Sequence, residues 1–268
     1  MKYRLMEETN STLTTYGIVL HRIQALRDFG DVKEGDLGGW IEKERNLSQE
    51  GKCWVYCDAH VYGNALVSEN AMVLDDARVY GKACVGGNAR VYRYARVCDE
   101  AKVYGEAQVY KDAIIRGNAH VYGNARVYGG ANVYGNARVY GFGAVNDTAC
   151  VSENAMVLGY AYVSGDSYVK GNAIMSGEAE VYGDTIISAG SWNKTPLQID
   201  GSIFPVNMIT PEILMIGCEE HTIPTWLKDY GTIAAEHDIT DEAMIEEYYG
   251  YIKKFAEKYC PEALEEKK

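Results

Sequence analysis

The sequence of 268 residues lacks the long apolar segments that mark membrane and exported proteins. No apolar run reaches 18 residues, so we expect no transmembrane helix and no membrane partner. The opening residues, Met1 to Arg4, lead into no signal-peptide core, which favours a cytoplasmic protein. The seven cysteines are odd in number, which favours free thiols in a reducing compartment over a disulfide framework.

Metal ligands in a recognisable arrangement are also missing. The spacing Cys53-x3-Cys57 is the pattern most like a metal-binding motif, but the sequence contains no second pair of ligands to complete a site. Structural zinc sites need four ligands, so we expect no metal site.

Acidic side chains outnumber basic ones by 38 to 26, so the net charge is −12. The deficit is greatest in residues 191–268, which carry 7 basic and 15 acidic side chains, whereas residues 55–190 carry 11 and 14. Binding to duplex DNA in general needs many cations to neutralise phosphates, so we exclude that partner. An acidic segment is more often solubilising than a mimic of nucleic acid.

What the sequence does contain is a six-residue repeat that runs from Val55 to Ile187 without an insertion. Val, Ile or Met occupies all 23 positions of this series, and 20 of them are Val. The fourth residue after each of the first 22 is Ala in 19 cases, the exceptions being Gly143, Ser167 and Thr185. A repeat this long and regular predicts a solenoid.

Each repeat predicts a short strand followed by a corner. Val suits the strand because it is β-branched, Gly and Asn tolerate the positive φ of a corner, and Ala fits inside a sharp bend. Three repeats would close one triangular coil of 18 residues, so about seven coils would stack about 4.8 Å apart. Val and Ala would fill the interior, and the residues on either side of each Val would face outward.

The repeat, of which Val61-Tyr62-Gly63-Asn64-Ala65 is one copy, resembles that of the left-handed parallel β-helix family. The best-known members of that family are hexapeptide-repeat acyltransferases. The left-handed winding is implied by the resemblance alone, since the general crossover rule favours the right hand. A pentapeptide prism is excluded because the period is six.

A narrower resemblance lies at the N-terminal end. Residues 25–29 (Ala-Leu-Arg-Asp-Phe), 38–41 (Gly-Gly-Trp-Ile) and 47–51 (Leu-Ser-Gln-Glu-Gly) resemble the start of YdcK-like hexapeptide proteins. These occur in bacteria and bacteriophages, and bacterial members carry acyltransferase names that rest largely on fold. The resemblance covers about residues 1–190. The C-terminal segment, with Ile216-Gly217-Cys218 and His221, is more similar to end modules of gut-phage relatives.

The chain is expected to have three parts, because the open ends of a solenoid need caps. Residues 1–54 would form a β cap and an irregular first coil, in which Ile41, Leu47 and Cys53 lie six apart but two residues out of the main register. Residues 55–190 would form the β-helix, and residues 191–268 an α/β cap. In that cap we predict strands at 202–208 and 212–218 and helices at 224–237 and 241–259, the second capped by Thr240.

Two histidines of the repeat, His60 and His120, are the candidate catalytic bases. Both precede a core Val and should face solvent without a carboxylate partner. His60 would stack under Arg78, and His120 would lie between Lys102 and Arg138, whose charges would keep it neutral. The family resemblance implies an active site in which one subunit supplies a histidine and a neighbouring subunit completes the site. Many members of the family also have a loop that covers the acyl donor or the substrate. No loop interrupts this repeat, so a surface role for both histidines is favoured.

Cys218 and His221 are a further candidate pair, as nucleophile and base. No third residue that would orient the base is identifiable. A packing role for the cysteine is therefore favoured.

Stacking the repeats by 18 residues predicts two outward ladders of tyrosines edged with polar or cationic residues. One contains Lys102, His120 and Arg138 beside Tyr104, Tyr122 and Tyr140. The other contains Arg90, Gln108 and Arg126 beside Tyr92, Tyr110 and Tyr128. Such ladders could stack bases, hold a phosphate-bearing ligand or pack against another subunit. Tyrosine pairs also stabilise sheets without any ligand.

Three functions remain open on this evidence. The first is a non-catalytic binding or assembly protein, a dimer or trimer without a cofactor, that presents its tyrosine faces to a partner. The second is an acyltransferase that binds acetyl-CoA between subunits and uses His120 or His60 as base. The third is a phage-encoded inhibitor that binds a host protein or sequesters a nucleotide.

Overall fold

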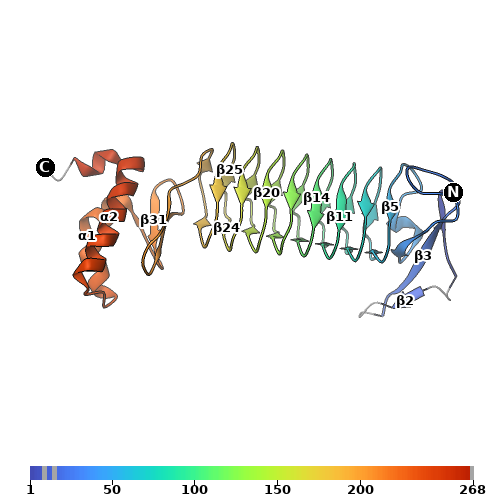
Figure 1. The fold of residues 1–268 in the computed structure, drawn as a ribbon, viewed down its shortest axis with the longest axis horizontal. Helices are drawn as coiled ribbons and strands as arrows, with labels where there is room; N and C mark the ends of the chain where they lie inside the picture. The colour runs from blue at the N-terminus through green and yellow to red at the C-terminus, as the bar shows by residue number, and fades with distance from the viewer. Residues whose placement is uncertain (8–10, 14–16, 266–268) are drawn as a thin grey trace.

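The computed structural model describes residues 1–7, 11–13 and 17–265. Most of this chain is a slender solenoid of short parallel strands, with an antiparallel cap at its N-terminal end and an α/β module at the other (Figure 1). The solenoid that the six-residue period predicts is therefore confirmed.

Three parallel sheets form the faces of the solenoid, and each strand pairs with the strand one coil later. The first face contains β4 (Leu37–Ile41), β6 (His60–Val61), β9 (Arg78–Val79), β12 (Arg96–Val97), β15 (Ile114–Ile115), β18 (Asn132–Val133), β21 (Cys150–Val151), β24 (Tyr168–Val169) and β27 (Ile186–Ile187). The second face contains β7 (Leu66–Val67), β10 (Cys84–Val85), β13 (Lys102–Val103), β16 (His120–Val121), β19 (Arg138–Val139), β22 (Met156–Val157), β25 (Ile174–Met175) and β28 (Ser191–Trp192). The third face contains β5 (Trp54–Val55), β8 (Met72–Val73), β11 (Arg90–Tyr92), β14 (Gln108–Tyr110), β17 (Arg126–Val127), β20 (Ala144–Val145), β23 (Tyr162–Val163) and β26 (Glu180–Val181).

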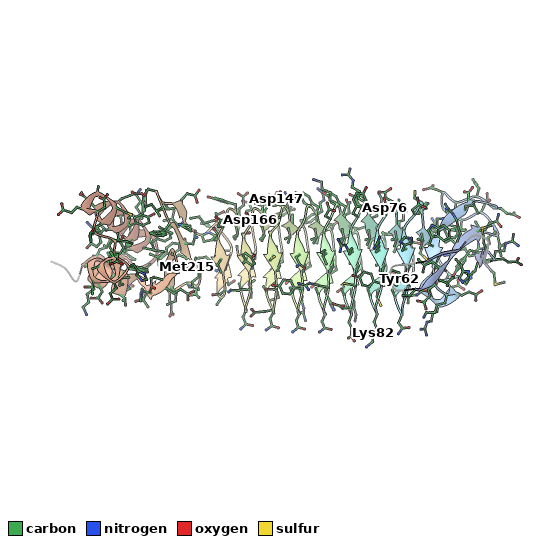
Figure 2. The ribbon with its side chains drawn as sticks, turned by 90° about the horizontal axis from the view of Figure 1, so that it is seen from below. Tyr62, Asp76, Lys82, Asp147, Asp166 and Met215 are labelled. Carbon is green, nitrogen blue, oxygen red and sulfur yellow. The ribbon has the colours of Figure 1, made fainter. Side chains whose placement is uncertain are left out.

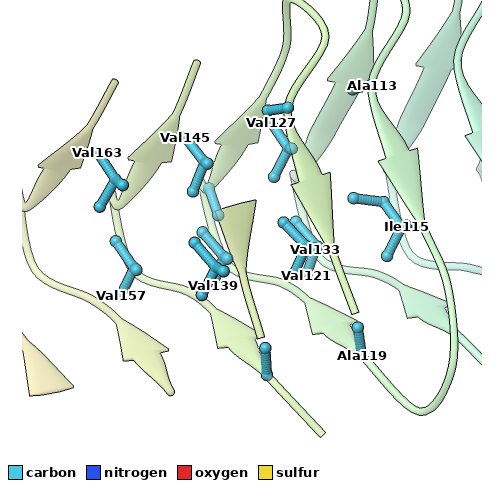
Figure 3. Packing of buried hydrophobic residues seen from close by; sticks show 14 of the residues in the cluster. Ala113, Ile115, Ala119, Val121, Val127, Val133, Val139, Val145, Val157 and Val163 are labelled. Carbon is cyan, nitrogen blue, oxygen red and sulfur yellow. The ribbon is translucent and has the colours of Figure 1, made fainter. Parts of the chain in front are cut away.

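The interior is a single column of Val and Ala side chains. All 23 apolar positions of the repeat are 0% exposed, and Figure 3 shows some of these side chains, such as Val121 and Val139, inside the ring of strands. Burying one Val side chain stabilises a fold by about 1.5–3 kcal/mol. The repeated pair of Val and Ala is therefore the main source of stability of the solenoid.

The corners depend on residues in the left-handed region. Gly105 has φ +73°, and a Cβ there would lie 2.8 Å from the backbone nitrogen of Gly123 in the next coil. Where the corner is acidic, the carboxylate caps the coil that follows. Asp99, at φ +57°, accepts a hydrogen bond of 2.9 Å from the N–H of Gly117. Side chains line the edges: Asp76, Asp147 and Asp166 project from one edge and Lys82 from another (Figure 2).

An irregular coil precedes the regular repeat and brings the total to about eight, as the eight strands of two faces indicate. Ile41 and Leu47 pair with Val61 and Val67, which lie 20 residues later, so the predicted offset of two is confirmed. Cys53, six residues after Leu47, does not occupy the third core position of this coil. Val55 occupies that position and pairs with Val73, because the segment from Leu47 to Val55 is two residues longer than a regular repeat.

The N-terminal cap extends the first face with antiparallel strands. These are β1 (Tyr3–Leu5), β2 (Ser11–Leu13) and β3 (Val19–Ala25), and β3 pairs with β4. The short 3-10 helix η2 (Glu44–Asn46) follows β4. Trp54 is buried beneath the cap against Tyr3 and Phe29, so the open end of the solenoid is covered.

The C-terminal module has four antiparallel strands rather than the two predicted. They are β29 (Gln198–Asp200), β30 (Pro205–Met208), β31 (Ile213–Ile216) and β32 (Glu219–Thr222). The helices α1 (Ile223–Glu236) and α2 (Glu242–Tyr259) and the 3-10 helix η3 (Pro261–Leu264) follow. The outer strands β29 and β32 are short and polar, so no apolar alternation revealed them.

The predicted cap of α2 was one residue too early. Asp241, not Thr240, is the N-cap, and its Oδ1 accepts hydrogen bonds from the N–H groups of Ala243 (2.9 Å) and Met244 (3.3 Å). A carboxylate also interacts favourably with the helix dipole. Neither helix of the described chain is long and apolar enough to cross a membrane.

Candidate binding face

The second face carries the first predicted ladder, which we call the central ladder. Strands β13, β16 and β19 place Lys102, His120 and Arg138 in register, one above the other. Each strand is followed by the matching tyrosine. The central ladder comprises Lys102, His120, Arg138, Tyr104, Tyr122 and Tyr140. The structure therefore brings all six residues together, because each coil repeats the same backbone path.

The tyrosine rings of the central ladder are stacked almost parallel. The ring centroids of Tyr104 and Tyr122 lie 4.9 Å apart, and those of Tyr122 and Tyr140 lie 4.8 Å apart, each pair with an interplanar angle of 2°. These spacings follow the rise of one coil and suit offset stacking. Tyr104, at 37% exposed, is the most open of the three.

His120 is a neutral imidazole between two cations. Partial burial lowers its pKa, and the charges of Lys102 and Arg138 lower it further. The edge of the imidazole meets the ring of Tyr104, with centroids 6.2 Å apart and planes at 76°. No carboxylate within the described ranges forms a hydrogen bond or ion pair with His120. The uncharged ring keeps a nitrogen lone pair that can act as a base, but no carboxylate among the described residues orients it.

His60 lies at the N-terminal end of the first face in a more crowded setting. It stacks in register between Trp40 and Arg78. Burial and the charge of Arg78 lower its pKa, and two nearby aspartates oppose that shift. The guanidinium of Arg22 covers the Trp40 ring at 5.3 Å. This packing leaves His60 less open to a substrate than His120.

The second predicted ladder lies on the third face, on strands β11, β14 and β17. It comprises Arg90, Gln108, Arg126, Tyr92, Tyr110 and Tyr128, and its tyrosine centroids are 4.9 Å apart. Its polar groups are partly used within the ladder: the Tyr92 hydroxyl donates to Gln108 Oε1 at 3.4 Å, and the Tyr128 and Tyr162 hydroxyls are 3.4 Å apart. Burial and the contact with Tyr162 raise the pKa of Tyr128.

A third tyrosine stack was missed by the sequence analysis. The rings of Tyr62 and Tyr80 on the first face are 5.1 Å apart and 3° from parallel, although the same 18-residue spacing would have revealed them. Tyr62 is only 7% exposed and is labelled in Figure 2. Because tyrosines stack here without being open to a ligand, ring stacking alone does not mark a binding site. The greater exposure of Tyr104, 37% against 7% for Tyr62, distinguishes the central ladder from this stack.

A polar cavity of about 330 Å³ lies at the N-terminal end of the second ladder. Lys52 and Arg90 line it together with Asp31 and Glu106. Its charges are therefore balanced, which makes it less suited to a phosphate than the central ladder.

The candidate pair Cys218 and His221 does not form a hydrogen bond in the structure. Cys218 is exposed in the turn between β31 and β32. The Nε2 of His221 instead lies 3.2 Å from Glu219 Oε2, and its ring meets Trp226 edge-on at 5.0 Å. In the part of the chain that the structure describes, no cluster of three or more ligand side chains is arranged for a metal ion.

Comparison with known proteins shows what this repeat is similar to. The family profile described as YdcK Beta solenoid repeat matches residues 119–133, which contain β16, β17 and β18, one strand from each face. The Escherichia coli (strain K12) protein named "Uncharacterized acetyltransferase YdcK" is 41% identical to this chain over 78 residues. That match covers 27% of this chain and 24% of the relative, so the chain spans about a quarter of the relative's length in the alignment.

Proposed function

We propose that this chain, whose β-solenoid resembles the YdcK repeat, is a rigid binding protein whose central ladder holds a phosphate-bearing ligand. The observation that carries the proposal is the placement of Lys102 and Arg138 on either side of a neutral His120. Neither cation forms a salt bridge with another described residue. Both charges are therefore available to an anion.

The geometry of the central ladder suits an extended ligand with a flat ring. Lys102 and Arg138 are two coils apart, about 10 Å at the usual spacing between strands. The stacked tyrosines beside them offer ring edges and protonated hydroxyls, since burial raises the pKa of Tyr122. Coenzyme A combines these features, because it carries two separated phosphate groups for the two cations and an adenine ring that can meet the exposed tyrosine edges.

Binding of coenzyme A, followed by calorimetry, tests the proposal. Lys102→Gln and Arg138→Gln should each weaken binding by about tenfold, because a hydrogen bond to a charged group contributes about 1.5–3 kcal/mol. Arg96→Gln is the matched control: this exposed cation lies on the first face, away from the central ladder. Equal losses in all three variants, or no binding at millimolar concentration, would contradict the proposal.

Acetyl transfer is the second candidate, and the name of the Escherichia coli relative supports it. In that case His120 would take the proton from an acceptor amine or hydroxyl as the acetyl group passes from the thioester sulfur to the acceptor. The proton would then pass to the departing thiolate, so that coenzyme A leaves as the thiol. The neutral state of His120 suits a general base, and Lys102 and Arg138 would hold the phosphates of acetyl-CoA.

Chromatographic detection of released coenzyme A, over a panel of amines and alcohols, separates the two functions. If the protein transfers acetyl groups, His120→Ala should abolish acceptor-dependent release, whereas the more enclosed His60→Ala should retain it. Acetyl-CoA that binds but is not consumed in the presence of any acceptor supports the binding function alone.

We also propose that copies of the chain associate through a tyrosine face as a dimer or trimer, because Tyr and Arg are enriched at interfaces. Native mass spectrometry of the wild type and of Tyr104→Glu would show this. A carboxylate introduced at the open end of the central ladder should return the oligomer to a monomer. A wild type that is monomeric at micromolar concentration would contradict the proposal.

The free cysteines support a reducing cellular compartment for this protein. All seven are free thiols in the structure, and we propose a cytoplasmic location. Thiol titration of protein isolated under alkylating conditions should find seven reactive groups after denaturation.

A further inference from the structure

The C-terminal module contains a cavity that is separate from the solenoid ladders. Its volume is about 220 Å³, and residues from the end of β31, the turn to β32, helix α1 and the segment after it form its wall. The wall includes Phe204, Ile216, Trp226, Ile233 and Ala234. Every lining residue belongs to the segment 204–239, so the cavity does not depend on the central ladder.

The body of the cavity is apolar. The indole Nε1 of Trp226 donates to the backbone oxygen of Leu214 at 2.8 Å, so its polar atom is already satisfied within the fold. An apolar cavity of about 150 Å³ is enough to take up benzene. The present one is larger, so a single aromatic ring or a short branched chain fits it.

The mouth of the cavity, in contrast, is a negative site. Glu219 lines it, and its side chain is 34% exposed. Its carboxylate oxygens lie 3.2 Å from Nε2 of His221 and 3.1 Å from Nε2 of His237. A carboxylate has about four acceptor positions, so two histidine contacts leave room for another donor.

Helix α1 adds to this negative potential. It ends at Glu236, and His237, which lines the cavity, is its C-cap. The carboxyl end of a helix carries a partial negative charge, and no basic residue lies in the last turn of α1. No Lys or Arg lines the cavity, and Glu236 and Asp238 flank His237 in sequence. An ammonium group therefore meets a carboxylate here, whereas an anionic ligand meets no Lys or Arg in the lining.

We propose that this cavity binds a small amine with an apolar ring or short branched chain, its ammonium on the Glu219 carboxylate. The apolar end enters the cavity between Trp226 and Ala234. The charge of the ammonium is neutralised by Glu219 and by the carboxyl end of α1. Cys218, exposed in the adjoining turn and part of the lining, lies at the entrance.

Three probes of similar shape and different charge test the assignment: phenethylamine, ethylbenzene and 3-phenylpropanoate. Their binding to the full chain is measured by calorimetry, and the rate of maleimide labelling at Cys218 is measured by mass spectrometry of the tryptic peptide. Phenethylamine should bind most tightly and should slow labelling at Cys218, while labelling at the distant, exposed Cys84 stays unchanged.

Glu219→Gln should weaken phenethylamine about tenfold, as expected for a charge-assisted hydrogen bond, and leave ethylbenzene unchanged. Glu220→Gln is the matched control, since the neighbouring side chain on β32 does not line the cavity. Ala234→Phe, which fills the cavity, should abolish binding of both probes; Ala234→Val serves if that variant does not fold.

Failure of phenethylamine to saturate by 10 mM would overturn the proposal. Tighter binding of 3-phenylpropanoate than of phenethylamine, or an unchanged affinity in Glu219→Gln, would overturn it as well.

Discussion

The Nζ of Lys2 lies 3.2 Å from the Sγ of Cys53 in a buried corner of the N-terminal cap. Lys2 is only 1% exposed, and its Nζ also donates to the backbone oxygens of Cys53 at 3.0 Å and Glu50 at 3.2 Å. Burial lowers the pKa of Lys2 and raises that of Cys53. The start of the chain thus holds the segment that contains the two extra residues of the first coil.

Replacing Lys2 tests how much this contact contributes. Lys2→Met keeps an unbranched side chain of nearly the same length but leaves the carbonyls of Glu50 and Cys53 without their donor. We expect a loss of about 1–3 kcal/mol in the free energy of unfolding, the usual cost of an unsatisfied buried group. Urea denaturation measures it, with exposed Lys52→Met as control. A more stable Lys2→Met variant would mean that the desolvation of the amine outweighs its hydrogen bonds.

The corners of the solenoid should tolerate a methyl group only where φ is negative. Gly105→Ala places a Cβ at φ +73° and 2.8 Å from the next coil, and we expect a loss of about 2 kcal/mol or more. At Gly130 the nearest atom is 3.4 Å away and φ is not positive. Gly130→Ala should be neutral or stabilise by up to about 1 kcal/mol. Equal urea midpoints for the two variants would refute this account of the corners.

The tyrosine stack of the central ladder should contribute to stability independently of any ligand. Tyr122 touches a ring on each side, so Tyr122→Ala should cost about 1–2 kcal/mol. Tyr122→Phe keeps both ring contacts and should stay within about 0.5 kcal/mol of the wild type. Thermal and urea unfolding of the two variants distinguish ring stacking from the contribution of the hydroxyl.

The two solenoid histidines should make the protein less stable in acid. Burial and neighbouring cations lower the pKa of both His60 and His120 in the folded state. Between those lowered values and the ordinary value of about 6.5, the unfolded chain binds more protons than the folded one, so stability falls as the pH drops through this window.

The measurement is the urea midpoint at pH 7.5 and pH 5.5. The double variant His60→Gln/His120→Gln should lose less stability than the wild type between these two values. An identical loss in both proteins would show that other groups, such as the carboxylates, account for the whole effect.

The sequence by itself determined the regular part of the fold. Val121 pairs with Val139 and Tyr122 stacks on Tyr140, as the 18-residue spacing predicts. The reason is local: side chains alternate along each strand, and every coil contains the same number of residues, so the place of one residue fixes the place of its equivalents. The same 18-residue spacing predicts that Lys102, His120 and Arg138 lie in one column.

Only the tertiary structure decided what lies outside the repeat. The two extra residues of the first coil are taken up between Leu47 and Val55, where the buried Lys2 packs against them. The contact between Glu219 and His237 likewise joins a strand to the end of a helix. No period relates such residues, because their distance depends on how separate elements pack, and packing is a property of the whole folded chain.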